Sequence, residues 1–460
     1  MNRFTGCGIV GKVRRATLVS LLFIAAYFLW FAFDGTRVGW TEDDGMNFYI
    51  YWKPGFAKVV QSNLTFWTGF YRPLGGLFYS PIYAVAGMNP KPYRWVDFLL
   101  LALNTLLIYR LAWKLSAGNG RLAALASLFG CVHGMMADLV YNTSSIYDVM
   151  AVTFSLLSLI VYTGRPMGIK RFLAVLVLMV LALNAKEIAA TLPAFFLLYE
   201  VLLQPPSKMR RNAWWSFVAL AVAGIAMYGK MHGPEAMTMN EAYRPVFTFS
   251  RWLDTNVAYT GAILYHLSMS SGAVIGLWIL MVIIAAVSKS RVMAWALFVM
   301  LLSTIPISFI PKRVGGSLYL PLIGWAIWFA AFFDWLISWL PNRFGLRNAA
   351  TLVLALVFWR WTAQGFTGKG DWWRRTQATP NRVMTALENL HYQPPHGKRI
   401  LFLGSPYKNV YDLVFLSNMV WNDRSLNIDD AIMTPDHGAD QSAYDIVIAF
   451  EGDRLRVLKQ

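Results

Sequence analysis

Two adjacent carboxylates, Asp43 and Asp44, stand in the first long polar segment of the chain. A carboxylate can take a proton from a hydroxyl group, so either residue could act as a general base. The pair could also hold a divalent cation weakly, or work without one. The competing interpretation is structural, because acidic residues also cap helices at a membrane surface.

Three cations elsewhere in the chain complement the acidic pair. Arg72 lies in the same polar segment, and Lys312 and Arg313 directly follow Pro311. Because arginine binds phosphate through two parallel hydrogen bonds, Arg313, helped by Lys312 and Arg72, could stabilise a departing phosphate group. The structural alternative is that Arg313 only marks a membrane interface.

Four further polar residues are candidates for the same site. Lys186 and Glu187 are adjacent, and the favoured interpretation is a self-neutralising pair that ends a short helix. Packing explains His133 more readily than chemistry does, and Asp138 suits an interfacial position. The histidines and cysteines show no metal-ligand spacing, so the acidic pair is the one candidate metal site in the sequence.

The amino-acid composition indicates the environment in which these residues lie. Hydrophobic residues make up 57% of the chain and charged residues only 14%, and apolar runs long enough to cross a bilayer recur. The formal net charge of +17 comes from short clusters of Lys and Arg between these runs. This distribution indicates a polytopic α-helical membrane protein among membrane lipids, and it argues against nucleic-acid binding.

The basic clusters also orient the predicted helices. Because Lys and Arg favour the cytoplasmic side, they place the N-terminus in the cytoplasm, with the plasma (inner) membrane as the expected location. About eleven transmembrane helices are predicted. They cover residues 16–33, 93–113, 122–138, 146–163, 172–185, 188–203, 213–230, 262–287, 292–310, 317–339 and 348–364.

The polar candidates fall on the external side of this topology. The first external loop, residues 34–92, holds the acidic pair and Arg72. It also contains an apolar stretch at residues 74–86, which is too short to cross and is expected at the interface. Later external segments hold Asp138, Asp148, Lys186, Glu187 and Arg313. One external site shared between loops is the simplest account.

The last part of the chain has lower hydropathy. A membrane domain is predicted over residues 1–366 and a small external α/β domain over residues 367–460. In the second, a helix is expected over residues 371–390, with Pro380 suiting a helix start. Strands are expected at residues 400–403, 444–450 and 454–458. No nucleotide-binding glycine loop occurs, so we expect this domain to pack on the membrane part or to contact a substrate.

A reaction that suits these groups is the transfer of a sugar from a lipid phosphate. It needs a base for the acceptor proton, which Asp43 or Asp44 would supply. It also needs cations for the departing phosphate, which Arg313 and its neighbours would supply. No nucleotide site is then required, because the donor arrives in the membrane.

Three segments carry a family pattern, in order along the chain. They are residues 71–74 followed by 87–93 and Asn104, residues 182–193, and Arg313 followed by residues 318–324. Together they resemble the multi-span glycosyltransferases of the C-type (GT-C) superfamily. The likeness is particularly to the transmembrane O-mannosyltransferases with TPR repeats and to their bacterial relatives.

The resemblance implies a GT-C fold and inverting transfer from a polyprenyl-phosphate-linked sugar, of hexosyl or mannosyl type, at the periplasmic or lumenal face. It implies that Asp43 and Asp44 form the catalytic acidic motif. It also implies that Arg313 and Tyr319, from one segment, face the donor phosphate, and that Asp148 takes the place of a family Asp at the start of the fourth helix. The acceptor stays open among protein, lipid and glycan.

Two alternatives remain open. A transporter or flippase of lipid-linked glycans would line a pathway with the same charges, although no internal inverted repeat is evident and the charge is confined to one face. An inactive scaffold that keeps the fold is the second. The family's His-Pro-x-His is reduced here to residues 132–135, and no TPR repeats follow.

Overall fold

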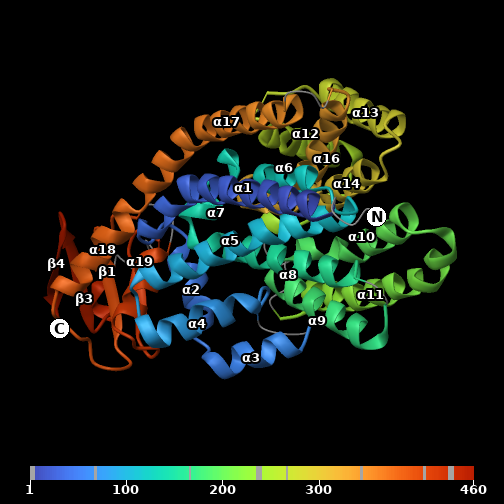
Figure 1. The fold of residues 1–460 in the computed structure, drawn as a ribbon. Helices are drawn as coiled ribbons and strands as arrows, with labels where there is room; N and C mark the ends of the chain where they lie inside the picture. Colours follow the sequence, from blue (N-terminus) through green and yellow to red (C-terminus); the bar gives the residue numbers. More distant parts are fainter. Residues whose placement is uncertain are drawn as a thin grey trace.

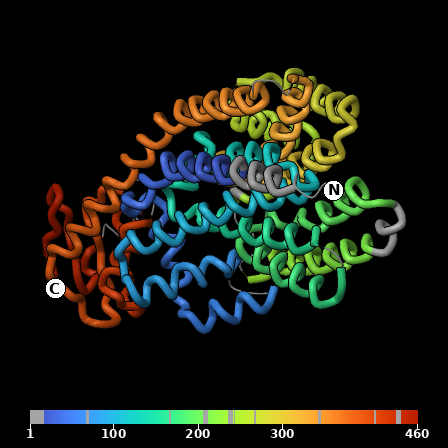
Figure 2. The backbone as a smooth tube through the Cα atoms, viewed as in Figure 1, coloured from blue at the N-terminus to red at the C-terminus, as the bar shows by residue number. Residues whose placement is uncertain are grey.

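Helices form most of the molecule, and a small sheet stands at one end (Figure 1). The computed structural model describes residues 6–66, 70–164, 167–234, 241–265, 268–341, 345–407, 411–433 and 440–460. The C-terminal end of the chain lies at the sheet end of the molecule (Figure 2). Helices α1 (Gly6–Ala32) and α5 (Pro90–Leu115) run side by side from near the sheet into the bundle.

The remaining elements of the helical bundle follow in chain order. The longer helices are α6 (Gly120–Cys131), α8 (Ile146–Tyr162), α9 (Ile169–Ala185), α10 (Leu192–Leu198), α11 (Pro206–His232), α12 (Phe249–Ile263), α13 (Ser271–Val287), α14 (Arg291–Ser303), α16 (Tyr319–Ser338) and α17 (Leu346–Thr376). Short helical turns connect them: η2 (Gly134–Met136), α7 (Asp138–Tyr141), η3 (Thr143–Ser145), η4 (Glu187–Thr191), η5 (Tyr199–Leu203), η7 (Glu241–Tyr243), α15 (Ile305–Ser308) and η8 (Gly315–Leu318).

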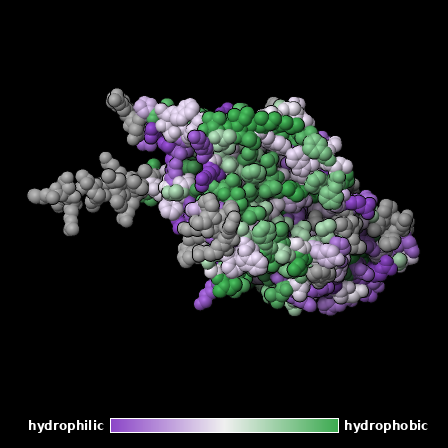
Figure 3. Space-filling model, turned by 90° about the vertical axis from the view of Figure 1, so that its right-hand side faces the viewer, coloured by the Kyte–Doolittle hydropathy of each residue, from purple (hydrophilic) through white to green (hydrophobic). Residues whose placement is uncertain are grey.

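Among the described residues, six helical segments are long and apolar enough to cross a bilayer. They are Thr17–Arg37, Pro90–Leu115, Thr143–Tyr162, Asn212–His232, Arg291–Ser308 and Gly315–Ser338. Hydrophobic side chains spread over the middle of the face drawn in Figure 3, as expected for a surface that meets lipid. The prediction of a polytopic helical membrane protein is therefore confirmed.

The predicted count of about eleven crossings is not confirmed, because only six described segments are long and apolar enough. The run predicted over residues 188–203 is one continuous helical segment, made of the turn η4, α10 and the π-helical η5, and it is not among those six. The span predicted over residues 262–287 begins only at Ser271, since Tyr265 takes a left-handed φ of 57° just after α12 ends.

Local sequence signals explain where the bundle helices start and how closely they pack. The Asn89 side chain accepts a hydrogen bond from the Lys91 N–H and Pro90 occupies the first turn, so α5 begins there. Helices α14 and α16 approach so closely that a Cβ on Gly324 would lie 2.6 Å from the Met300 nitrogen. Small residues allow such approaches between membrane helices.

The predicted first external loop folds into a layer of short helices. These are η1 (Phe33–Arg37), α2 (Asp44–Trp52), α3 (Phe56–Leu64) and α4 (Leu74–Ala86). The apolar stretch predicted at residues 74–86 is thus a short helix. Aromatic rings join α2 to α4, with Phe48 and Tyr79 stacked at 5.5 Å, so the loop has a core of its own.

The C-terminal end forms a small α/β unit, which we call the external domain after its predicted side of the membrane (residues 377–460). Its elements are α18 (Ala378–Asn389), β1 (Arg399–Leu403), α19 (Asp412–Val420), β2 (Asn427–Asp430), η9 (Gln441–Ala443), β3 (Ile446–Glu451) and β4 (Arg454–Lys459). The strand order is β2-β1-β3-β4, with β1 parallel to both neighbours and β4 antiparallel to β3. The three predicted strands are confirmed, whereas β2 was missed because its sequence, Asn-Ile-Asp-Asp, is mostly polar.

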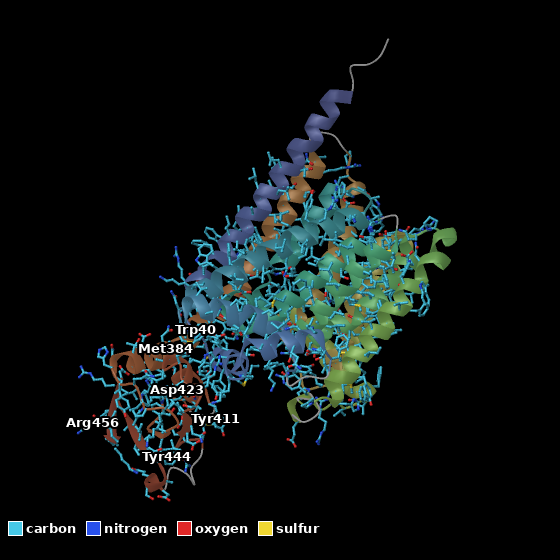
Figure 4. All side chains as sticks on the ribbon, turned by 90° about the horizontal axis from the view of Figure 1, so that it is seen from below. Trp40, Met384, Tyr411, Asp423, Tyr444 and Arg456 are labelled. Atoms are coloured by element: carbon cyan, nitrogen blue, oxygen red, sulfur yellow. The ribbon has the colours of Figure 1, made fainter. Side chains whose placement is uncertain are left out.

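Helix α17 carries the chain from the bundle into the external domain, across the boundary predicted at residue 366. The single helix predicted over residues 371–390 is instead the end of α17 followed by α18. Pro380 explains the break, because it has no N–H to donate to the Thr376 carbonyl. Seen from below, the domain with Met384, Tyr444 and Arg456 stands apart from the bundle, and Trp40 of the first loop lies at the junction (Figure 4).

Candidate active site

A cavity of about 510 Å³ lies between the first loop and the bundle. The walls come from segments far apart in the sequence, including α2, α7, the start of α8, η4 and η8. Seven charged residues line it: Asp43, Arg72, Asp138, Asp148, Lys186, Glu187 and Arg313. Seven of the charged residues chosen from the sequence therefore share one cavity.

Asp43 lies at the start of α2 in a left-handed conformation, with φ of 75°. This conformation is uncommon for a residue other than glycine and turns the side chain away from its own helix, which it does not cap. Among the described residues, no group pairs with the Asp43 carboxylate. Although the side chain is open to the cavity, desolvation by the surrounding protein raises its pKa from the usual value.

Asp44, the second member of the acidic pair, points into the protein and is 1% exposed. Its Oδ2 accepts hydrogen bonds from the Thr41 N–H at 2.8 Å and from the Thr41 hydroxyl at 2.9 Å. The same oxygen lies 3.6 Å from an Arg94 nitrogen. Burial raises the pKa of Asp44, and Arg94 and Thr41 oppose that rise. The two carboxylates thus face different surroundings.

Lys186 is held by a buried ion pair at the cavity wall. Its Nζ lies 2.6 and 2.7 Å from the two carboxylate oxygens of Asp148, and it donates to the Ser317 hydroxyl at 3.2 Å. Asp148 comes from the first turn of α8, Lys186 from the residue after α9, and Ser317 from η8. One ammonium group therefore ties three segments together.

Glu187 pairs with Arg72 rather than with its neighbour. The guanidinium Nη2 lies 3.0 and 3.2 Å from the two carboxylate oxygens. The self-neutralising pair predicted for Lys186 and Glu187 is therefore wrong, since the extended backbone of Lys186 sends the two side chains to different partners. Burial alone would raise the pKa of Glu187, but Arg72 and Lys186 outweigh it and lower the pKa to about 2.

Asp138, for which an interfacial position was predicted, anchors the turn that follows Arg313. Its Oδ2 accepts a hydrogen bond from the Gly316 N–H at 2.7 Å. Gly315 has a positive φ of 83°, and a Cβ there would lie 2.7 Å from the same oxygen, so glycine is required. Burial raises the pKa of Asp138 to about 6.

Arg313 reaches the cavity, and its guanidinium lies over the Tyr243 ring at 4.6 Å from the ring centre. Lys312 is exposed and does not line the cavity. Two other sequence candidates also lie outside it. Tyr319 is 1% exposed within the core, and His133 is buried against Tyr265, with ring centres 4.3 Å apart. The packing interpretation of His133 therefore fits its surroundings.

Several cavity residues were missed by sequence reasoning. Tyr147 and Ser317 each stand close to a residue that was chosen, in the segments of Asp148 and Arg313, so local context could have found them. Tyr243 and Trp373 carried no chemical signal beyond aromatic character. Among the described residues, no three His, Cys, Asp or Glu side chains form a metal-ligand cluster.

Two solved structures share this fold. The crystal structure of ArnT from Cupriavidus metallidurans bound to undecaprenyl phosphate matches with a TM-score of 0.58 at 12% identity, over 96% of this chain and 98% of that chain. The cryo-EM structure of the arabinofuranosyltransferase AftD from mycobacteria gives a TM-score of 0.51 at 16% identity, over 95% of this chain and 35% of that chain. No model of a known protein family matches the sequence, and no curated protein matches it either.

At identities this low, a structural likeness describes the fold. ArnT and AftD are both GT-C glycosyltransferases, so the resemblance inferred from the three sequence segments is confirmed for the fold. The chain is therefore an integral membrane protein with the fold of the C-type (GT-C) membrane glycosyltransferases.

Proposed function

We propose that this protein transfers a sugar from a polyprenyl-phosphate-linked donor to an acceptor at the external membrane face, with inversion at the sugar carbon. The observation that carries the proposal is a contrast within one cavity. Asp148 and Glu187 each pair with a cation, whereas Asp43 has no ion-pair partner among the described residues. A general base needs a carboxylate oxygen that is open to the acceptor, and Asp43 offers one.

In the proposed reaction, the acceptor hydroxyl gives its proton to an Asp43 carboxylate oxygen and its oxygen attacks the sugar carbon that carries the phosphate. The bond from that carbon to the phosphate oxygen breaks while the new bond forms on the opposite face, so the configuration inverts. The electron pair of the broken bond stays on the polyprenyl phosphate. Cations of the cavity stabilise the negative charge that develops there.

Arg313 is the proposed ligand of that phosphate. Glu187 and Asp148 already neutralise much of the charge on Arg72 and Lys186. The guanidinium of Arg313 packs on the Tyr243 ring. This contact uses the face of the guanidinium, so its N–H groups can still donate to phosphate oxygens. Lys312 lies outside the cavity and acts only at longer range. Arg72 and Lys186 then shape the cavity and add to its positive potential.

Asp44 is proposed to position the loop rather than to react. Its carboxylate contacts Thr41 and Arg94, and these contacts fix the backbone next to Asp43. Because Asp43 and Asp44 point to different surroundings, the proposed mechanism uses the cations of the chain and not an ion shared by the pair.

The proposal also covers the class of the sugar donor and the orientation of the protein in the membrane. ArnT, which has the same fold, is bound to undecaprenyl phosphate in its crystal structure, and this supports a polyprenyl-linked donor. The basic clusters support a cytoplasmic N-terminus in the inner membrane, about eleven crossings and an external C-terminal domain. A hexose of mannose type is proposed from the sequence resemblance alone.

The test uses the purified protein in nanodiscs, a panel of labelled polyprenyl-phosphate sugars and a membrane extract as the source of acceptor. The measurement is the release of polyprenyl phosphate. Asp43→Asn keeps the shape of the side chain but not its basicity, so release should fall about 10²- to 10⁴-fold. Glu42→Gln is the matched control, since Glu42 is exposed and outside the cavity. Full activity in folded Asp43→Asn would reject the proposal.

A further inference from the structure

The external domain places one buried carboxylate against the candidate active site. Asp412 stands in the first turn of α19 and is 2% exposed. Its Oδ2 accepts a hydrogen bond from the backbone N–H of Asp43 at 3.1 Å. The contact joins residues 369 positions apart in the chain, so it exists only when the external domain is docked.

The start of α2 lacks a cap of its own. Asp43 is the N-cap residue, yet its side chain makes no capping hydrogen bond. The first N–H groups of a helix have no partner within it, and an uncapped buried start is costly. Asp412 supplies an acceptor oxygen from another domain, and this oxygen lies at the positive end of the α2 dipole.

Close packing around this contact leaves little freedom. A Cβ on Gly45 would lie 2.9 Å from Asp412 Oδ1 and 3.5 Å from Leu416 Cγ. Glycine at this position therefore allows α19 to approach the first turn of α2. The left-handed conformation of Asp43 is costly for a residue with a side chain, and such a conformation persists only where the surroundings impose it.

Other contacts hold the external domain on the first loop without help from Asp412. The Tyr83 hydroxyl donates to the Met419 carbonyl at 3.1 Å. The Tyr49 and Phe415 rings lie 4.9 Å apart. The Lys53 ammonium donates to the Arg424 carbonyl. Removal of the Asp412 carboxylate should therefore leave the domain docked and change mainly the chain at Asp43.

We propose that Asp412 is a positioning residue that caps α2 from the external domain and so aims the Asp43 carboxylate into the cavity. The inference rests on the proposed function, because it assigns Asp412 an effect on the base of that reaction. The external domain is then a part of the active site and not only a neighbour of it. Asp412 itself touches the Asp43 backbone and does not line the cavity.

The experiment compares four variants of the full-length protein in nanodiscs. Asp412→Ala removes the cap, Asp412→Asn keeps an acceptor oxygen, and Gly45→Ala pushes a methyl group against Asp412. Asp453→Ala is the control, because Asp453 is an exposed carboxylate of the same domain that pairs with Arg382 on the surface. The readouts are kcat and the donor KM for polyprenyl phosphate release, and hydrogen exchange of peptides from α2 and from the docking contacts.

In Asp412→Ala we expect kcat to fall about 100-fold, the scale of a base misplaced by about 1 Å, with the donor KM unchanged. Exchange should rise in the peptide that contains residues 43–46 and stay unchanged around Tyr83 and Tyr49. Asp412→Asn should recover most of the kcat. Gly45→Ala should resemble Asp412→Ala, and the double variant should be no worse than Asp412→Ala, since loss of the carboxylate relieves the clash.

Three results would overturn the inference. One is unchanged kcat and exchange in Asp412→Ala. Another is a rise of exchange over all docking contacts, which would make Asp412 a general docking residue. The third is an Asp412→Asn variant as impaired as Asp412→Ala. The Asp43→Asn variant is measured alongside: if it stays active, the proposed function fails, whereas an inactive Asp43→Asn with an active Asp412→Ala rejects the Asp412 inference alone.

Discussion

The charged residues of this protein include two neighbouring groups that differ in exposure: one lines a cavity, and the other is buried. In the cavity, seven charged side chains face an open space of about 510 Å³, and Asp43 is left without an ion-pair partner among the described residues. Directly beneath, Asp44, Arg94 and Asp97 form a sealed cluster whose members are all 2% exposed or less. The acidic pair of the first loop contributes one residue to each region.

The two regions also differ in how well their polar atoms are satisfied. In the sealed cluster, Arg94 donates to the Gly39 carbonyl at 2.7 Å. Within the described part of the chain, its Nε and Nη1 have no hydrogen-bond partner, and neither does Asp97 Oδ1. Arg94 and Asp97 are three residues apart on α5 and so lie on the same face. Unpaired buried atoms are costly, so this cluster depends on its internal charge balance. Charges that hold a membrane protein together are enclosed, and charges available for chemistry remain accessible.

The largest expected effect comes from breaking the sealed cluster. Arg94→Met keeps the length of the side chain but leaves Asp44 and Asp97 without a buried counter-charge. Removing one partner of a buried ion pair typically costs about 3–5 kcal/mol of stability. We therefore expect a large loss of folded protein, measured by thermal unfolding of the protein in detergent.

Arg374→Met is the matched control for that experiment. Arg374 pairs with Asp34 and Asp371, and all three side chains are at least two-fifths exposed. Exposed pairs contribute about 0–1 kcal/mol, so this variant should unfold close to the wild type. Equal unfolding temperatures for the two variants would mean that the sealed cluster is not a stability element, and the comparison would fail.

The second largest effect is expected in the cavity, where a substitution should lower activity without lowering the stability of the fold. Arg313→Ala should cost about 2–4 kcal/mol of transition-state stabilisation, the scale of losing one preorganised donor to a developing charge. The measurement is kcat/KM for release of polyprenyl phosphate. Lys312→Ala, one residue earlier but outside the cavity, should keep nearly full activity. If the two variants were equally impaired, the general positive potential rather than Arg313 would bind the phosphate.

Much of the fold follows from the sequence because hydrophobic length and charge placement leave few options in a bilayer. Apolar runs predict α5, α8 and α16 to within a few residues. The local departures from α-helix were not predicted. The 3-10 and π turns at the two ends of the segment at residues 188–203 and the left-handed Tyr265 depend on tertiary packing, which propensity does not report.

For the site, the sequence indicated residue types and the side of the membrane, but not the pairing. Asp43, Arg72, Asp138, Asp148, Lys186, Glu187 and Arg313 do meet. The pairing of Glu187 with Arg72 depends on how distant segments approach, which a single sequence does not contain. Asp412 could not be found for the same reason: it is one of several acidic residues in the external domain, and only docking gives it a role.

The smallest expected effect is on the pH dependence of transfer, and it tests whether Asp43 is the base in the cavity. A base works only when deprotonated, so transfer should be lost as the pH falls through the pKa of Asp43. Desolvation raises that pKa, so the acid limb of the pH profile should lie above about pH 4, the value for an exposed Asp. Burial raises the pKa of Asp412 to about 7, so Asp412 is protonated throughout an acid limb that lies below about pH 7. Asp412→Asn therefore removes no charge there, and although its rate is somewhat lower, the midpoint of its acid limb should coincide with that of the wild type. A midpoint shifted by more than about half a pH unit would mean that Asp412 is ionised beside Asp43. Burial under α19 would then raise the pKa of Asp412 less than the packing of α19 on α2 implies.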